Sequence, residues 1–391
     1  MSEIADLFQE YAELGGAVQR RIIEIDNRPA RAKRLRRFSL REAARYLGLD
    51  EPALRRRLQD PDAPQGERAG LTGRTFALGE IGALRRHLRD ATGEPCLAPG
   101  RGTGEGLQVV ALSNFKGGAA KTTTALHLAQ YLALRGYAVL LVDLDSQASA
   151  TAALGLGPDD DVGADGTLHP YFAGRIDTLA PLVRPTYWPG LDLIPANLGL
   201  YRVELELPLR QREEPGFRFW RLLEQGLATV AGRYDVVVCD CPPSLGYLSL
   251  NALFAATGLV VPAPPSMPDF ASTARFFQMM ADTLRDVAAF EGEAKRLDFV
   301  RILITKLNTA DRNHRRIAGW MESTFAGRVL KERMAATTAL DMAGNVKRTL
   351  YELEPGPGSR RSFERALDYM DGVNGAIEGL LRAAWGREGA A

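Results

Sequence analysis

The chain has 391 residues, 46% of them hydrophobic, with a formal net charge of +1, so it is long enough for two ordinary globular domains. This balance excludes a global electrostatic attraction to nucleic acid or membranes, and any such surface has to be local. No apolar run approaches the roughly 20 residues that span a bilayer, and the acidic amphipathic start is unlike a secretory signal. The three cysteines, Cys96, Cys239 and Cys241, cannot form a disulfide framework and indicate a reducing cytoplasm.

Residues 1–27 are predicted to be helical. Apolar residues recur every three to four positions from Ile4 to Ile25, across the pair Gly15-Gly16, which is typical of one helix or a broken pair with a buried stripe. A dimerisation element and simple packing against the core are both consistent with this pattern.

The charge then changes abruptly: residues 28–57 include eleven basic and three acidic residues. Within this segment Ser39 and Glu42 form the pattern of a capping box that begins a helix, and Gly48 ends it. Pro52 suits the first turn of a second helix that exposes three arginines. Two short helices around a glycine turn predict a helix-turn-helix.

Residues Gly70–Ala77 resemble a tight two-stranded wing with Arg74 near its tip, and Leu78–Leu88 resumes helical spacing. We therefore predict a winged helix-turn-helix domain over residues 28–92 that binds DNA, followed by a glycine- and proline-rich linker over residues 93–106. The alternative is a solvated basic face on a helical bundle. The residues expected to contact DNA are Arg41, Arg45, Arg55, Arg56, Arg57 and Arg74.

A glycine-rich loop, NFKGGAAKTTT, follows the apolar strand that begins at Val109 and precedes a helical stretch. Small residues let backbone N–H groups wrap phosphates closely, with the helix N-terminus adding partial positive charge. Lys121 would reach the phosphates and Thr122 would offer a hydroxyl to Mg²⁺. Ala120 stands where the pattern GxxxxGK[ST] has glycine, and its methyl group is tolerable only if the backbone avoids positive φ.

Acidic residues follow two further buried strands. Asp143 and Asp145 end one strand and Asp240 ends another, at the edge where ligands collect in parallel sheets. Asp240 fits a carboxylate that holds Mg²⁺ through water. The flanking Cys239 and Cys241 are interpreted as small core residues.

Additional apolar strands are expected at 191–195, 259–264 and 300–305, with helices between them. This alternation predicts an α/β fold over residues 107–391: a P-loop, doubly wound, mostly parallel sheet flanked by helices. Thr305–Asn308 follows a strand end and is expected near the adenine.

The stretches KGGAAKTTT with Lys116, VLLVDLDSQAS and DVVVCDCPP resemble the deviant Walker A ATPases of the ParA/MinD superfamily. The resemblance narrows to ParA-type partition ATPases with an N-terminal winged helix, especially the RepA proteins of repABC plasmids. It covers nearly the whole chain and implies ATP and Mg²⁺ as cofactors.

Site residues follow from this resemblance. Lys116 matches the lysine that reaches across a dimer to the partner's phosphates, and Asp145 matches the carboxylate that activates the attacking water. Asp143 is expected to be structural or to act on the site through a neighbouring residue. The implied metal site comprises Thr122, Asp145 and Asp240. The implied nucleotide cradle comprises Lys116, Gly117, Gly118, Ala119, Ala120, Lys121, Thr122 and Thr123.

The resemblance also implies partners: a homodimer, operator DNA on the winged helix, non-specific DNA on the ATPase dimer, and a ParB-type centromere-binding protein. The protein would be cytoplasmic and nucleoid-associated, without membrane binding. Two alternatives are a transcriptional repressor with ATP as an allosteric ligand only, and a MinD-like membrane regulator. Ordinary solvated helix faces are the alternative for the second basic set. The basic residues expected to hold non-specific DNA are Arg312, Arg315, Arg316, Lys331 and Arg333.

Overall fold

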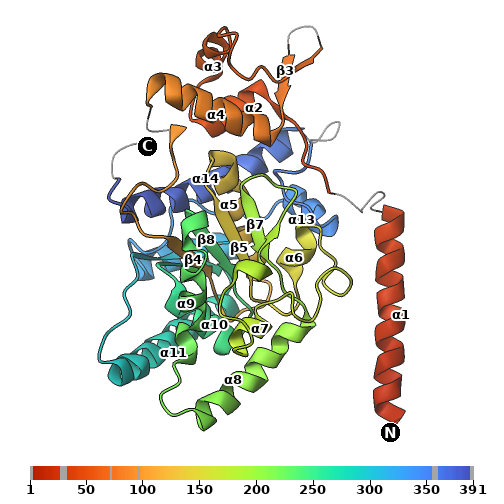
Figure 1. Ribbon diagram of the computed structural model, residues 1–391, viewed down its shortest axis with the longest axis vertical. Helices are drawn as coiled ribbons and strands as arrows, with labels where there is room; N and C mark the ends of the chain where they lie inside the picture. The colour runs from red at the N-terminus through yellow and green to blue at the C-terminus, as the bar shows by residue number, and fades with distance from the viewer. Residues whose placement is uncertain (1–2, 27–32, 71–72, 95–96, 355–359, 388–391) are drawn as a thin grey trace.

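A seven-stranded sheet in the order β10-β9-β4-β8-β5-β7-β6 forms the centre of the computed structural model (Figure 1). The structure describes residues 3–26, 33–70, 73–94, 97–354 and 360–387. All neighbouring strands are parallel except β6 and β7, which confirms the predicted α/β class. The strands are β4 (Gln108–Leu112), β5 (Val139–Asp143), β6 (Arg184–Pro185), β7 (Leu191–Ile194), β8 (Val236–Asp240), β9 (Gly258–Ala263) and β10 (Phe299–Ile304).

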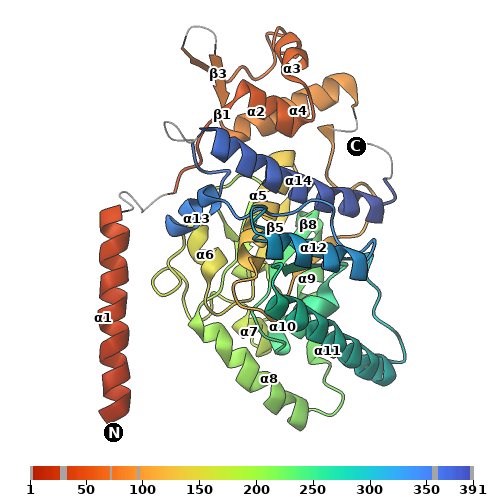
Figure 2. The ribbon, with the colours of Figure 1, turned by 180° about the vertical axis from the view of Figure 1, so that it is seen from behind.

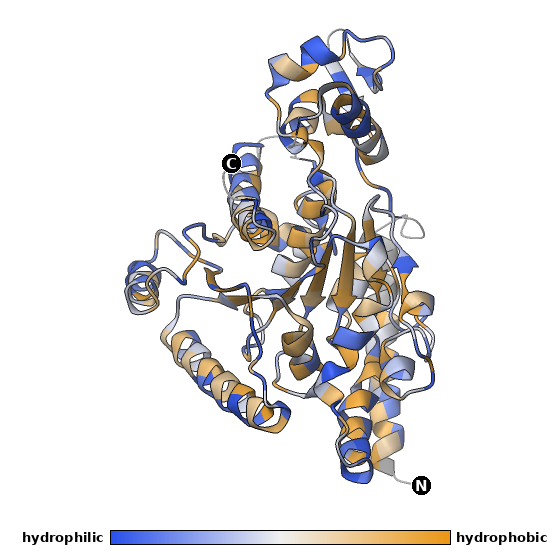
Figure 3. Cartoon of the chain, turned by 60° about the vertical axis from the view of Figure 1, so that its left-hand side comes forward, coloured by the Kyte–Doolittle hydropathy of each residue, from blue (hydrophilic) through white to orange (hydrophobic). Residues whose placement is uncertain are grey.

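The central strands are apolar along their whole length because both faces of the sheet are covered. Alternate residues of each strand enter two cores, so that Val110 packs with one and Val109 with the other. Figure 3 shows these strands as a hydrophobic layer between helices.

One core includes α5 (Lys121–Arg135) and α14 (Arg360–Ala384), with α6 (Ser149–Ala153) and α13 (Thr338–Asn345). The opposite core lies under a second set of helices, and α12 covers the β10 edge (Figure 2). These are α7 (His169–Phe172), α8 (Arg202–Glu213), α9 (Leu222–Ala228), α10 (Tyr247–Ala255), α11 (Met267–Glu291) and α12 (Arg312–Thr324). Short 3₁₀ turns occur at Ala180–Leu182, Leu198–Tyr201, Phe219–Arg221 and Ala231–Arg233.

The basic segment folds into a small module above the sheet domain, as Figure 1 shows. Its three strands pair antiparallel in the order β1-β3-β2. The capping box is confirmed, since Ser39 Oγ accepts from the Glu42 N–H and Glu42 accepts from the Ser39 N–H. The elements are β1 (Phe38–Ser39), α2 (Leu40–Leu47), α3 (Glu51–Arg57), β2 (Glu67–Ala69), β3 (Gly73–Phe76) and α4 (Leu78–Thr92).

The hairpin of this module corrects the predicted wing. Its first strand is Glu67–Ala69 rather than a segment that begins at Gly70, and its second is Gly73–Phe76. The register pairs Arg68 with Arg74. The predicted wing began after the first strand, at the glycines of the turn. The strand itself was not predicted because its sequence, ERA, lacks the apolar residues typical of a strand.

Helix α1 (Glu3–Asp26) is continuous through Gly15-Gly16 and stands apart from the rest of the chain (Figures 1 and 2). The prediction of a buried apolar stripe is wrong within this single chain. The large apolar side chains from Ile4 to Val18 are 41–65% exposed. The side chains of Ile22 and Ile25, and the predicted boundary between residues 27 and 28, lie outside the described residues. No helix in the described ranges is long and apolar enough to cross a membrane.

The predicted linker is fastened to the sheet domain over its described part. The Arg101 N–H donates to Asp235, Trp385 Nε1 donates to the Gly106 carbonyl at 2.8 Å, and Arg387 pairs with Glu105. These contacts hold the described part of the linker against the α/β domain.

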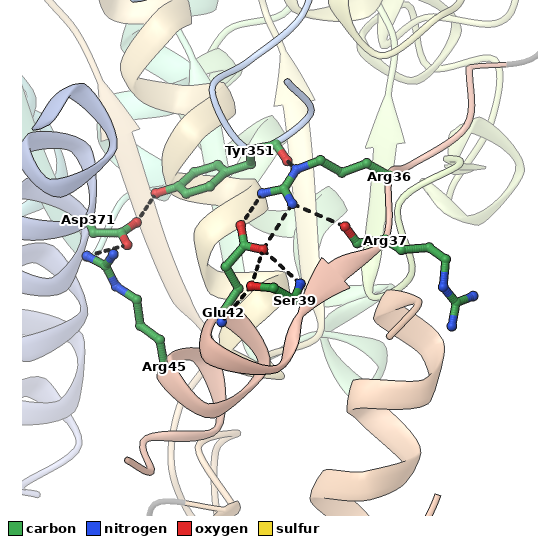
Figure 4. Close-up of polar contacts among 7 residues, drawn as sticks. All are labelled: Arg36, Arg37, Ser39, Glu42, Arg45, Tyr351 and Asp371. Atoms are coloured by element: carbon green, nitrogen blue, oxygen red, sulfur yellow. Dashed lines mark hydrogen bonds and ion pairs between the residues drawn. The ribbon is translucent and has the colours of Figure 1, made fainter. Parts of the chain in front are cut away.

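A polar junction connects the module to α14 (Figure 4). Arg36 donates to Glu42 and, at 2.9 Å, to the Tyr351 carbonyl. The Tyr351 hydroxyl donates to Asp371 at 2.7 Å, and Asp371 also pairs with Arg45 at 2.8 Å. Arg45 therefore lies in the junction between two carboxylates of α14 while 44% of its side chain stays exposed, and its role as a DNA contact stays a prediction.

Replacement of Asp371 by asparagine tests the junction through pH. Burial raises the pKa of Asp371 to about 6, and Arg45 opposes this rise. A raised carboxyl pKa means that the folded protein holds the proton more tightly, so stability decreases as pH rises through about 4 to 6. The parent protein should therefore lose stability relative to Asp371→Asn as pH rises. In urea titrations, the difference in unfolding free energy between variant and parent should increase by as much as about 3 kcal/mol between pH 4 and 7.

The control variant Arg45→Met should show the opposite trend. Removal of the guanidinium leaves Asp371 buried and unpaired, a cost present only when the carboxyl is ionised. Its destabilisation should therefore grow with pH. Parallel pH profiles for the two variants would contradict this account of the junction.

Candidate nucleotide site

The phosphate loop, residues Lys116–Thr123, joins β4 to α5 at the carboxyl edge of the sheet. Gly117 has no atom within 4 Å of a side chain built there, so the loop has room for a ligand beside its backbone. Lys121 is buried and its Nζ donates to the Lys116 carbonyl at 3.2 Å, whereas the Lys116 side chain is exposed. Burial lowers the pKa of Lys121, and Asp240 opposes this effect.

Ala120 adopts a positive φ, the backbone conformation in which its methyl group is unfavourable. Its φ is 71° and its ψ is 31°, in the left-handed region, which costs a residue with a Cβ about 1–2 kcal/mol. The Ala120 carbonyl accepts from the Thr124 N–H at 2.9 Å and from its hydroxyl at 2.7 Å. The first turn of α5 thus holds Ala120 in this strained conformation.

Asp143 at the end of β5 is completely buried, and its carboxylate is fully engaged. It accepts from the Thr151 N–H at 2.9 Å, the Thr151 hydroxyl at 2.7 Å and the Asp145 N–H at 3.2 Å. Burial raises its pKa to about 6. Through these three hydrogen bonds, Asp143 anchors the segment after β5.

Asp240 lies directly beside Asp143, since the two residues are register partners at the ends of β8 and β5. Unlike Asp143, it has two buried oxygens without a hydrogen-bond partner among the described residues. Burial and then the Asp143 charge raise the pKa of Asp240 well above its usual value, while the Thr122 hydroxyl and Lys121 oppose the rise. A buried carboxylate in this condition requires a proton or a cation.

These residues fit Mg²⁺ in the way that nucleotide enzymes hold it. No group of three or more histidine, cysteine, aspartate or glutamate side chains in the described ranges could hold a metal alone. Mg²⁺ needs no such cage, because it usually takes one or two carboxylates plus waters and substrate phosphates. Asp240 and the Thr122 hydroxyl would supply the protein side of this arrangement.

Asp145 differs from both neighbouring aspartates because it is only partly buried. Its Oδ1 accepts from the Gln147 N–H at 3.0 Å, and its charge acts on both Lys121 and Asp240. The structure thus brings Asp145 to the same edge as the loop. Its side chain has the access to solvent that a residue acting on water requires.

The cysteines beside Asp240 behave as core residues. Cys239 and Cys241 are buried and free, and burial raises the pKa of Cys239 to about 12. A protonated buried thiol is a poor metal ligand. Cys96 lies outside the described residues.

Sequence reasoning did not single out His127, one helical turn beyond the loop. Its Nδ1 contacts the Thr123 carbonyl at 2.7 Å and its Nε2 contacts the Leu350 N–H at 3.2 Å. These contacts require a neutral ring protonated on Nδ1, and burial lowers its pKa to about 4. Nothing in the local pattern LHLAQ distinguishes this histidine from an ordinary core residue.

The predicted DNA contacts of the module divide into free and engaged side chains. Arg41 and Arg56 are exposed. Arg55 pairs with Glu51 on its own helix, and Arg57 pairs with Glu94. Arg74 donates back to the Gln65 carbonyl at 2.9 Å, so it supports the base of the wing.

The second basic set lies on and beside α12, well away from the module in Figure 2. Arg312, Arg315 and Lys331 are exposed, and Arg316 is exposed with its guanidinium over Trp320. Arg333 pairs with Glu322. The structure therefore presents two separate basic surfaces.

Replacement of Ala120 by glycine should relieve the strained loop. Glycine adopts positive φ without the steric penalty but loses more entropy on folding, so we expect a net gain of about 0.5–1 kcal/mol in urea unfolding. Ala119→Gly is the matched control: Ala119 is buried without positive φ, and this variant should lose stability. Destabilisation by both substitutions would contradict the strain at Ala120.

Replacement of Asp240 by asparagine removes the unpaired charge at constant volume. Without ligand the variant should melt about 2–4 °C higher than the parent protein, and Mg²⁺ with nucleotide should add less stability to it. Asp143→Asn should instead lower the melting temperature, because it disturbs three hydrogen bonds. Equal losses in both variants would refute the distinction.

Comparison with known proteins identifies relatives that match most of the chain. Residues 107–285 match a family model described as an AAA domain. The chain is 40% identical to a candidate replication protein A of Rhizobium rhizogenes, over 92% of this chain and 90% of that protein. It is 32% identical to the protein SopA of Escherichia coli, over 92% of each.

Solved structures and a third relative agree with this result. A partition protein shares the fold over 95% of this chain and 99% of its own, with a TM-score of 0.61 and 20% identity. Cobyrinic acid a,c-diamide synthase from Mycobacterium smegmatis, solved with ADP and magnesium, is 30% identical over 59% of this chain and 87% of its own, with a TM-score of 0.50. A ParA family protein of Chlamydia trachomatis is 32% identical over 68% of this chain and 97% of its own length. At these identities and coverages, the chain belongs to the ParA family of partition ATPases.

Proposed function

We propose that this protein is a Mg²⁺-dependent ATPase that dimerises with ATP, binds DNA and segregates a plasmid or other replicon. Hydrolysis to ADP and phosphate would be slow until DNA and a ParB-type centromere-binding partner stimulate it. The observation that carries the proposal is Asp240 beside Thr122 and the phosphate loop: its two buried oxygens have no hydrogen-bond partner of good geometry in the part of the chain that the structure describes. The synthase solved with ADP and magnesium, 30% identical to this chain, supports the cofactor assignment.

Each residue of the site then has a distinct task. The backbone of Lys116–Thr123 cradles the phosphates, and Lys121 supplies a buried positive charge. Thr122 and Asp240 hold Mg²⁺, which neutralises charge on the phosphates when bound. Asp145 orients the attacking water from its partly exposed position and contacts the metal shell.

A dimer would complete the site. The Lys116 side chain is exposed, so it is free to reach a nucleotide in a partner subunit, as an arginine finger does in trans. The exposed apolar side chains of α1, including Phe8 and Tyr11, favour the dimerisation interpretation of that helix over packing within the chain. ATP binding would thereby switch the protein from a monomer to a dimer.

The two basic surfaces suit two kinds of DNA contact. In the module, α3 would enter the major groove of operator DNA and thereby repress the protein's own operon, with exposed Arg41, Arg55 and Arg56 as contacts. The surface of α12 would hold DNA through phosphates without reading sequence. Such a protein would be cytoplasmic and associated with the nucleoid.

A repressor that uses ATP only as an allosteric ligand is a second candidate. The polar junction favours it. Arg36 and Arg45 connect α2 to Tyr351 and α14, while Leu350 and α14 contact His127 of α5 behind the loop. No comparable observation favours a MinD-like membrane regulator, since the apolar stripe of α14 is buried against the sheet domain.

Replacement of Asp145 by alanine separates the two candidates. Loss of the residue that orients water should lower ATP turnover by about 10²–10⁴-fold and abolish plasmid segregation, while operator repression persists. The control Asp160→Ala changes an exposed aspartate in an acidic loop and should keep full turnover. Segregation by the Asp145 variant, or parent turnover unaffected by DNA and partner, would contradict the proposal.

A further inference from the structure

Lys306 lies beside the phosphate loop although it is far from it in sequence. It follows β10, and the preceding residue, Thr305, is buried and donates its hydroxyl to the Ala119 carbonyl at 3.0 Å. The ammonium of Lys306 is 4.0 Å from the point where a side chain on Gly118 would begin. The end of β10 and the phosphate loop thus lie in direct contact.

The backbone of Lys306 is held in an unfavourable conformation. Its φ is 51°, one of four positive values among non-glycine residues that the structure describes. Such a conformation costs lysine about 1–2 kcal/mol, and such strain tends to persist at functional sites. Two of the four strained residues, Ala120 and Lys306, therefore border the same loop.

The Lys306 ammonium is available for a ligand. Its side chain is exposed, and within the described ranges it has no ion pair with an acidic residue. A Cβ at position 118 would be in ordinary van der Waals contact with the ammonium, so the ammonium lies against the loop at Gly118, whose φ is 73°. An exposed ammonium beside this loop adds positive charge where backbone amides of a phosphate loop favour an anion.

We propose that Lys306 contacts the phosphate chain of the nucleotide bound in this loop. The inference rests on the proposed function and adds a third ammonium to the site. Lys121 would act from within the loop, Lys116 would serve the partner subunit, and Lys306 would contact phosphate in its own subunit from the β10 side. This role differs from the contact with adenine expected for this segment.

Nucleotide titrations of full-length variants test the contact. Lys306→Gln should bind Mg-ATP, Mg-ADP and Mg-tripolyphosphate about tenfold more weakly than the parent protein, since one charge-assisted hydrogen bond is lost. The difference should shrink as salt is added. Lys306→Arg keeps the charge and should recover most of the affinity.

Lys347→Gln is the matched control. Lys347 is also an exposed lysine with positive φ, at 50°, but it follows α13 rather than the loop. It should bind all three ligands as the parent protein does. Circular dichroism and melting curves of each variant establish that the fold is intact.

The outcomes separate the inference from the proposed function. Unchanged affinity in Lys306→Gln, or an equal loss in Lys347→Gln, would overturn the role of Lys306 alone. A loss with Mg-ATP but not with Mg-tripolyphosphate would assign Lys306 to the adenine and would also overturn it. A parent protein that binds no nucleotide would instead refute the proposed function, and the inference with it.

Discussion

Two buried carboxylates at the ends of adjacent parallel strands set the central constraint of this structure. Asp143 and Asp240 are register partners, so their charges are forced together in a region without solvent. Asp143 is satisfied by hydrogen bonds from the segment after β5. The two Asp240 oxygens are buried without a hydrogen-bond partner of good geometry among the described residues, so a proton or a bound cation is needed to stabilise this carboxyl. The fold thus places uncompensated negative charge beside the start of the phosphate loop.

Helix α5 connects this site to the basic module. The helix begins at Lys121, directly after the strained N-cap residue Ala120, and farther along it His127 contacts Leu350. The next residue, Tyr351, lies in the polar junction with Arg36 and Asp371 (Figure 4). Buried polar contacts of this kind require defined geometry, because an unpaired member is costly in a low-dielectric interior. One rigid element therefore contacts both the nucleotide loop and the base of the module.

Much of the architecture could be predicted because it depends on short-range patterns. The apolar strands, the phosphate loop and the capping box at Ser39 each involve neighbouring residues and specific backbone requirements. Prediction was poorer where a pattern allowed several partners. The apolar spacing of α1 indicated a helix correctly, but only the fold showed that nothing in the described chain covers its side chains.

The sequence by itself determined the order of elements, the small residues of the loop and the acids at the strand ends, since these follow from local backbone geometry and hydrophobic periodicity. Tertiary structure alone decided which charges meet. Arg45 contacts Asp368, 323 positions away, and Lys306 approaches Gly118 across the sheet. The sequence signalled neither the positive φ of Ala120 nor the lack of partners at Asp240. Burial and pairing depend on how distant segments pack, and local sequence does not encode that packing.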